Sequence, residues 1–349
     1  MRFIPLFCPR IGCPSAYGER AFRWIRRGRY RRQCDGRWIP RFHCSACDRS
    51  FSSQTYRSSF RYRKPVLHLA LLPLLCSKVT RRQAARILGV NRKTVERRFV
   101  RMAQIARDFH RWKLSSSRAQ GGISGVFQLD ELETFEHHRL LKPVTMSVLI
   151  ERRSYFVVDL RAGRLASRRP LHRRNEERAI ELEALEGRRA SDSSACVQRS
   201  FRTLAQLLRP GCAVYLQTDR KPTYPVECRK AMPRRRVIHS TESSRTLRNK
   251  KNLLFPINHT LAMMRDGMSC LVRRSWGHSK RRTGLQRHAW IWCVYRNYVR
   301  GVTNSTRTTP AQSAGVCQAA FTFREAFQWR WPSWMSPSQR HSKGPASGV

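Results

Sequence analysis

Two aspartates stand at the ends of apolar segments in this chain. Asp130 ends the run that begins at Val126, and Asp219 ends the run that begins at Ala213. Such short runs of alternating and apolar residues predict β-strands. Carboxylates at strand ends can hold divalent cations, because Mg²⁺ prefers oxygen ligands. Each aspartate alone also fits a structural role, since aspartate is common in turns and at strand ends.

The charge balance makes these acids more informative. The 349 residues include 70 Lys and Arg against 22 Asp and Glu, a net charge of +48 with a pI near 11.6. Such a chain repels itself unless a polyanion screens it, so nucleic acid is the expected partner. The 40% hydrophobic fraction excludes a disordered basic tail protein and predicts two or three folded domains. A basic chain that keeps acids at strand ends is typical of an enzyme that cuts phosphodiesters.

Four cysteines near the start have the pattern of a metal site. Cys8 and Cys13 form one pair, Cys44 and Cys47 form a second, and a β-prone segment separates them. Four thiolates satisfy a tetrahedral Zn²⁺, so residues 1–63 are predicted to form a zinc ribbon. Unliganded thiols are the alternative, and Cys34 is a spare candidate ligand. Fifteen arginines against three acids in this segment favour a DNA-contacting module over a redox site.

Residues 64–112 have the pattern of a helix-turn-helix, with a break expected at Pro73. A first helix ends near Gly89, and Asn91 can cap a second helix. The exposed start of that second helix would contact DNA through Arg92, Lys93, Thr94 and Arg97. The alternative is a basic helical hairpin that packs on the next domain.

Residues 120–300 are predicted to form a mixed α/β domain. Strands are expected over residues 126–129, 144–150, 155–160 and 213–217, and helices over 175–186, 201–208, 255–272 and 284–299. Residues 301–349 are predicted to be a poorly ordered tail, and its tryptophans Trp329, Trp331 and Trp334 could form a small partner-binding segment. No apolar run reaches the roughly 20 residues of a membrane span and the start does not fit a signal peptide, so we expect no membrane association and a cytoplasmic, nucleoid-associated protein.

The order of these motifs resembles bacterial insertion-sequence transposases with a ribonuclease H-like catalytic core, most closely the insertion sequence one family. The resemblance covers about residues 8–315 and is carried by the cysteine pairs, the helix-turn-helix and the motifs Phe127–Glu131, Tyr215–Pro222, Asn258–Arg265, Leu271–Trp276, Tyr295–Tyr298 and Thr309–Ala311. The fold expected from it is α/β, ribonuclease H-like, preceded by a zinc ribbon and a helix-turn-helix.

The resemblance implies a catalytic site with two Mg²⁺ or Mn²⁺ ions held by three side chains. Asp130 and Asp219 match the first two positions, and the third, usually glutamate, falls on Asn258. Arg265 and Lys280 would contact DNA phosphates. An amide brings no charge to a metal, so Glu131, Glu133 and Glu242 are alternatives, although Glu131 points to the opposite strand face from Asp130.

The function implied by the resemblance is a DNA transposase. It would bind insertion-sequence ends as a homo-oligomer on double-stranded DNA and catalyse metal-dependent cleavage and strand transfer. A catalytically inactive DNA-binding protein, a decayed transposase, is the alternative suggested by Asn258. A general RNA-binding basic protein is a third possibility, but it would leave the two aspartates without a role.

Overall fold

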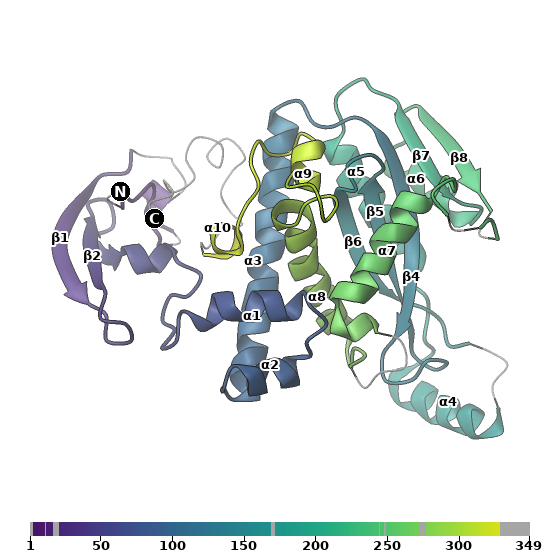
Figure 1. Cartoon of the computed structure of the whole chain (residues 1–349), viewed down its shortest axis with the longest axis horizontal. Helices are drawn as coiled ribbons and strands as arrows, with labels where there is room; N and C mark the ends of the chain where they lie inside the picture. The colour runs from purple at the N-terminus through teal and green to yellow at the C-terminus, as the bar shows by residue number, and fades with distance from the viewer. Residues whose placement is uncertain are drawn as a thin grey trace.

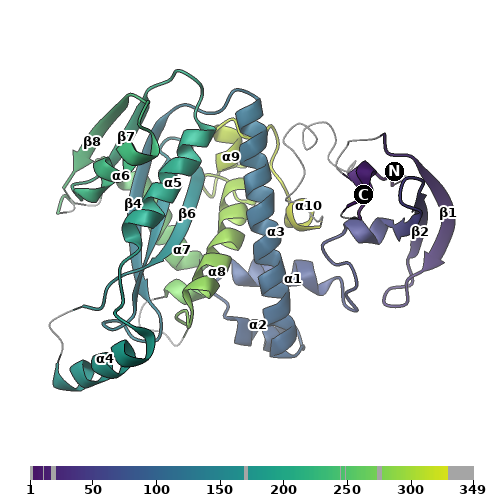
Figure 2. The ribbon, with the colours of Figure 1, turned by 180° about the vertical axis from the view of Figure 1, so that it is seen from behind.

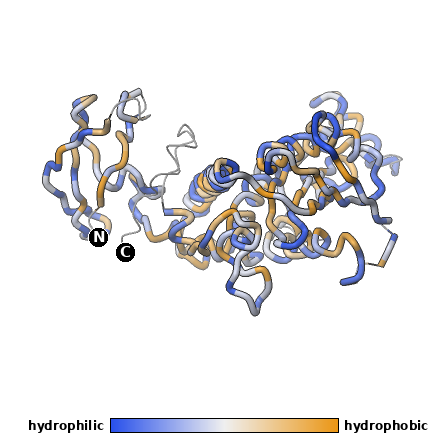
Figure 3. The backbone as a smooth tube through the Cα atoms, turned by 90° about the horizontal axis from the view of Figure 1, so that it is seen from above, coloured by the Kyte–Doolittle hydropathy of each residue, from blue (hydrophilic) through white to orange (hydrophobic). Residues whose placement is uncertain are grey.

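The computed structural model describes residues 3–10, 12–16, 21–168, 172–243, 245–247, 249–272 and 277–328. A small β-ribbon built from the first 60 residues lies to one side of a larger body of helices around a five-stranded sheet (Figures 1 and 3). The chain therefore separates its cysteine-rich start from the part that holds the two aspartates.

The ribbon is an antiparallel sheet of β1 (Trp24–Arg31), β2 (Trp38–Cys44) and β3 (Arg49–Ser52), flanked by the 3-10 turns η1 (Pro14–Ala16) and η2 (Ser53–Tyr56). Nearly all of β1 is exposed, since five of its eight residues are arginine or glycine. Its buried cluster is small and includes Cys8, Cys13 and Cys44. A unit with so little apolar core needs a crosslink or a metal for stability.

Three helices follow, α1 (Leu67–Leu75), α2 (Arg81–Ile87) and α3 (Arg92–Ala119). Thr80 and Gln83 form a capping box at the start of α2, and the Asn91 side chain accepts a hydrogen bond from the Lys93 N–H. Gly89 has a φ of +58°, which allows the tight turn between α2 and α3. The helix-turn-helix geometry agrees with the sequence, but Pro73 lies inside α1 and does not end it.

The boundary predicted at residue 112 is wrong, because α3 continues to Ala119. Its 28 residues span about 42 Å. Helix α3 packs against α8 (Arg282–Val294), with Phe99 against His288 and His110 against Trp290, so one hydrophobic core runs from Leu71 to Phe327 and joins the helix-turn-helix to the α/β domain.

The large sheet has the order β6-β5-β4-β7-β8. Its strands are β4 (Val126–Phe135), β5 (Pro143–Glu151), β6 (Val157–Arg164), β7 (Val214–Asp219) and β8 (Val237–Glu242). β5 is antiparallel to β4 and β6, whereas β7 is parallel to β4 and to β8. The sequence did not predict β8 as a strand, because it is an exposed edge strand within an arginine-rich segment and lacks a continuous apolar pattern.

Helices cover both faces of this sheet. α5 (Ser193–Leu207) and α6 (Thr223–Ala231) lie on the face seen in Figure 2, and α7 (Phe255–Gly267), which precedes the short η3 (Ser269–Leu271), lies on the face seen in Figure 1. α4 (Arg173–Glu186) projects from one end. The mixed α/β class predicted from the sequence is confirmed.

The open edge of β6 is covered by α8 and the π-helical turn η4 (Tyr295–Val299). The Asn297 side chain bonds both the N–H and the C=O of Val157, and the Gln286 side chain bonds the Ala162 N–H and the Leu160 C=O. Two amide side chains thus stand in for a missing neighbouring strand and block edge pairing.

The expectation of a poorly ordered segment from residue 301 is wrong for residues 301–328. They form α9 (Pro310–Ser313) and α10 (Phe323–Phe327) and pack on the core: Phe327 is fully buried, and the Phe321 ring contacts Phe109 and Tyr298. The anchoring aromatics are widely spaced, so no periodicity marked them. Trp329, Trp331 and Trp334 lie outside the described residues.

Candidate active site

Asp130 and Asp219 lie on two adjacent parallel strands, Asp130 in the middle of β4 and Asp219 at the carboxyl end of β7. Gln128 of β4 pairs with Gln217 of β7, and two residues further along both strands stand Asp130 and Asp219. The side chains of Gln128 and Gln217 share a 2.9 Å hydrogen bond, so both point to the same face. Since side chains alternate along a strand, both aspartates point to that face too, on strands about 4.8 Å apart.

A third carboxylate extends this row. Glu242 ends β8 and pairs in register with Asp219, which places it on the same face. The sequence interpretation put Glu242 in a basic loop, so its alignment with the aspartates was missed. The only signal was the pair Val237–Ile238 four residues before it.

Local hydrogen bonds orient all three carboxylates. The Glu131 N–H donates to Asp130 Oδ1 at 2.7 Å, and the Lys221 N–H donates to Asp219 Oδ1 at 3.0 Å. Hydrogen bonds from the Thr246 hydroxyl and the Ser243 N–H lower the pKa of Glu242. Orientation by neighbouring donors is what preorganises carboxylates as ligands for a hard cation.

Helix α7 covers the same face as the aspartates. Gln128 accepts a hydrogen bond from the Ile257 N–H at 3.0 Å and donates to the Leu253 carbonyl at 2.7 Å, which fixes the start of α7 over β4. Asn258 is the next residue and is half-buried. The structure therefore places it at the level of Gln128, two residues before Asp130 along β4.

The side of α7 that carries Asn258 can be read from its neighbours. His259 stacks on Phe255 and contacts the Tyr155 ring in the β5–β6 turn. Asn258 and Arg265, seven residues apart, share one side of α7, about 100° around the helix from His259.

The two predicted phosphate contacts lie further along β4 than Asp130. Arg265 lines a hollow together with Glu133 and Phe135. The Lys280 ammonium is exposed and 2.9 Å from His278 Nε2, and the His278 ring packs against Phe135. These basic groups stand beside the site and not within it.

Glu131 faces the opposite side of the sheet from Asp130, as expected from the alternation of side chains along a strand, and it is held there by hydrogen bonds. Its side chain is only 6% exposed and accepts hydrogen bonds from Lys221, Ser193, Thr145 and Tyr224. Burial alone would raise its pKa, but the bonds from Lys221 and Ser193 outweigh burial and lower it. Because Glu131 follows Asp130 in β4 and Lys221 lies two residues after Asp219 at the end of β7, this ion pair links the two strands that carry the aspartates.

Lys221→Met should lower the free energy of unfolding by about 2 kcal/mol near neutral pH, because it leaves the Glu131 carboxylate without its cationic partner. The loss is limited because Lys221 is partly exposed to solvent. The pKa of Glu131 is lower in the folded protein than in the unfolded chain, where it is about 4.3. The ion pair with Lys221 therefore stabilises the fold fully above that unfolded pKa, and this stabilisation is lost as the pH falls through the folded pKa. The gap between variant and wild type in urea unfolding should therefore narrow below about pH 4.

Lys78→Met is the matched control, since Lys78 pairs with Asp266 at the surface. It should cost less than about 1 kcal/mol. Equal losses of unfolding free energy in the Lys221 and Lys78 variants would contradict a buried ion pair at Glu131. So would a stability difference between Lys221→Met and wild type that does not narrow in acid.

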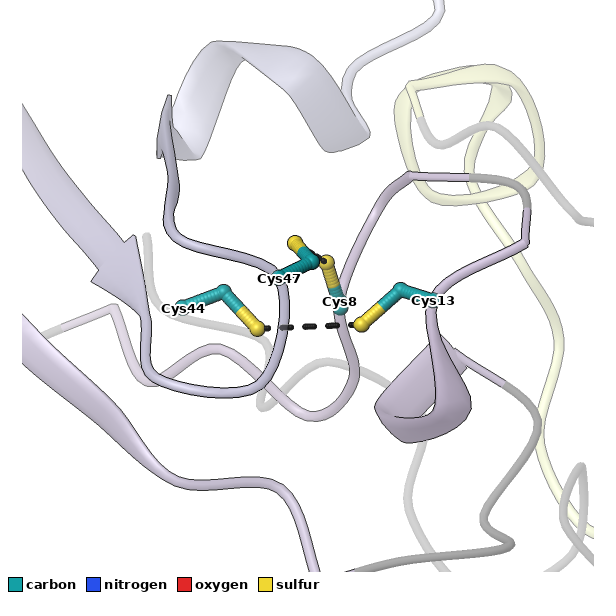
Figure 4. Close-up of side chains that lie close together, drawn as sticks. All are labelled: Cys8, Cys13, Cys44 and Cys47. Atoms are coloured by element: carbon teal, nitrogen blue, oxygen red, sulfur yellow. Dashed lines mark hydrogen bonds between the residues drawn. The ribbon is translucent and has the colours of Figure 1, made fainter.

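The four predicted zinc ligands converge in the ribbon (Figure 4). Cys8 Sγ lies 3.7 Å from Cys47 Sγ, and Cys13 Sγ lies 3.8 Å from Cys44 Sγ. Four sulfurs bound at 2.3 Å around a tetrahedral Zn²⁺ are about 3.8 Å apart, whereas a disulfide needs about 2.05 Å. The cluster is therefore compatible with zinc, and Cys34 is exposed and outside it.

Backbone N–H groups favour the thiolate form of one cysteine in this cluster. Burial raises the pKa of Cys8 and of Cys13. Burial would also raise the pKa of Cys44, but hydrogen bonds from the N–H groups of Ala46 and Cys47 outweigh it and lower that pKa. Such N–H groups are the usual partners of thiolate ligands in a metal knuckle.

The predicted DNA-contacting residues at the start of α3 are well placed for a macromolecule. Arg92, Lys93 and Arg97 are exposed and Thr94 is half-buried. Val95 and Phe99 point the other way into the core, so the helix presents its basic side outward.

Comparisons with known proteins include a distant likeness to a solved structure. The chain is similar to the catalytic domain of the Mos1 mariner transposase, with 15% identity over 54% of this chain and 92% of that chain and a TM-score of 0.21. No family model matches the sequence, and no curated protein matches it. A likeness this weak assigns no function, so the functional argument rests on the residues of this chain.

Within the described residues no helix has the length and apolar character needed to cross a membrane.

Proposed function

We propose that this chain is a DNA transposase that binds insertion-sequence ends and catalyses metal-dependent strand cleavage and strand transfer. The observation that carries the proposal is the pairing of Gln128 with Gln217, because Asp130 and Asp219, each two residues further along its strand, then lie on one face of adjacent strands. The strand order and the antiparallel β5 support a ribonuclease H-like core. The net charge of +48 supports a nucleic acid substrate.

The donor set fits Mg²⁺ or Mn²⁺, because oriented carboxylate oxygens are the ligands these ions prefer. Asp130 and Asp219 would hold the ions, and Asn258 would add an amide oxygen from α7. When bound, the ions would activate a water or 3′-hydroxyl and stabilise charge on the phosphate. The chain's own part is to fix the two carboxylates through the Glu131–Lys221 tie and to orient the strand with Arg265 and Lys280.

The remaining parts fit recognition of DNA ends. The ribbon, with zinc held by Cys8, Cys13, Cys44 and Cys47, and the exposed start of α3 would bind the terminal repeats. We propose a homo-oligomer on DNA, because strand transfer must bring two ends together.

The test uses a linear duplex made from the DNA that borders the coding region. The protein should nick this duplex near the border in Mg²⁺ or Mn²⁺, leave it intact with Ca²⁺ alone, and join the freed 3′-end to a second duplex. Specific binding without nicking in either ion would favour the inactive DNA-binding protein, a reading supported by the uncharged Asn258. Absence of binding to any duplex would contradict both.

A further inference from the structure

A second basic surface lies on the face of the molecule opposite α7. Two adjoining hollows run between α3, α5, α8 and the edge strand β6, and both are lined by Arg199 and Trp290. Figure 2 shows these three helices side by side. We call this continuous hollow the arginine groove.

Arginines dominate the lining. α3 supplies Arg107, Arg111 and Arg118, and α5 supplies Arg199 and Arg202. Three further arginines come from β6 and α8: Arg161, Arg282 and Arg287. The acids in the lining are Asp159 and Asp192, so eight guanidinium groups face two carboxylates.

Both carboxylates are already neutralised. Asp159 pairs with Arg161 at 2.7 Å, and Asp192 pairs with Arg282 at 2.6 Å. A third pair joins Arg107 to Asp108 beside the groove. In the described part of the chain, the other five arginines have no carboxylate partner. Their charges also crowd one another: burial lowers the pKa of Arg111, and Arg107 and Arg161 lower it further.

The charged lining favours a polyanion over a small apolar ligand. The hollows measure about 440 and 330 Å³, the size of a site for a drug-like molecule, but such sites have few charged side chains, whereas eight arginines line these two. Trp290 is only 5% exposed, so it cannot offer its ring to an unpaired base. Single-stranded nucleic acid binding relies on exposed aromatic platforms, which this groove lacks.

The spacing fits a phosphate backbone. Arg107, Arg111 and Arg118 lie on one stripe of α3, because steps of four and seven residues return to the same helix side. The stripe is about 16 Å long, which corresponds to about five base-pair steps along the axis of duplex DNA. Arginine is the side chain best suited to phosphate, since its planar fork donates two parallel hydrogen bonds.

We propose that the arginine groove is a second DNA-binding site, which holds the phosphate backbone of duplex DNA without reading its sequence. It lies on the α5 side of the sheet, whereas Asp130 and Asp219 face α7, so DNA in the groove does not occupy the active site. The inference extends the proposed transposase function, but binding in the groove requires no cleavage.

The test measures duplex affinity as a function of salt in Ca²⁺ without Mg²⁺. A short duplex unrelated to the element's ends is titrated at about 50 to 200 mM salt with Arg111→Gln/Arg202→Gln. Each lost phosphate contact should reduce the magnitude of the slope of log K against log salt by about 0.9. The slope of the double variant should therefore be smaller in magnitude than that of the wild type by about 1.8. Arg111→Lys/Arg202→Lys keeps the charge and should restore most of the slope.

Arg174→Gln/Arg178→Gln on α4 is the matched control, with the same charge change at exposed positions outside the groove. An equal loss in the control pair, an unchanged slope in the groove variant, or a loss seen with single-stranded RNA but not with duplex DNA would overturn the proposal. Asp130→Asn should keep the wild-type slope. Failure of cleavage is therefore distinguishable from failure of the groove.

Discussion

Replacement of Asp130 or Asp219 by Asn should abolish metal-dependent nicking, with a fall in rate of at least about 1,000-fold. A bound metal ion contributes several kcal/mol to the stability of the transition state, and each 1.4 kcal/mol changes the rate tenfold. Asn preserves shape but removes the charge that holds the cation. The rate is measured by nicking of the bordering duplex at saturating Mg²⁺.

Glu133→Gln is the matched control for the loss of one acid from β4. Glu133 is exposed and pairs with Arg168, so the variant should keep its nicking rate within a few-fold. Equal losses in the Glu133 and Asp130 variants, or normal nicking by both aspartate variants, would refute the assignment of these two residues. DNA affinity in Ca²⁺ should stay close to wild type throughout, because binding depends on the basic surfaces.

The third ligand is decided by a second pair of variants. Asn258→Ala should raise the Mg²⁺ concentration needed for half-maximal nicking, and Asn258→Glu should lower it because it adds charge. Glu242→Gln should have little effect, because β8 stands two strands, about 10 Å, from Asp130. If the Glu242 variant loses nicking and the Asn258 variants keep it, the third metal ligand is Glu242 of the sheet and not Asn258 of α7.

Much of this arrangement could be predicted from the sequence because its signals are local. The cysteine spacing, the apolar runs before Asp130 and Asp219, and the glycine turn before Asn91 each report a structure that forms within a few residues. The four cysteines converge and the four predicted strands are present, although β4 extends to Phe135, past its predicted end at residue 129.

What the sequence did not contain was pairing between distant segments. The register that aligns Glu242 with Asp219 depends on β8, an exposed strand with no continuous apolar pattern. Burial of the Glu131 side chain depends on segments far along the chain: Ser193 comes from α5, Lys221 from the β7–α6 turn and Tyr224 from α6. Such contacts follow from tertiary packing, which overrides local propensity.

Removal of one cysteine ligand should release zinc and unfold the ribbon while the larger body stays folded. Apparent binding free energies of structural zinc are about 10–16 kcal/mol at pH 7, more than the small cluster around Cys8 could replace. We expect Cys13→Ser to lose bound zinc and to become trypsin-sensitive within residues 21–63, where exposed arginines are dense. Residues 64–328 should remain resistant, because they share a separate core.

Cys34→Ser is the control, since Cys34 is exposed and outside the cluster. It should bind one zinc ion per chain and give the wild-type digestion pattern. Full zinc content in Cys13→Ser, or an unchanged digestion pattern after a chelator removes the metal, would show that the ribbon folds without the ion. Because the ligands must be thiolates, acidification should release zinc from the wild-type chain and expose the same trypsin sites. The ribbon would then be a metal-dependent DNA-contacting unit on a body that folds without it.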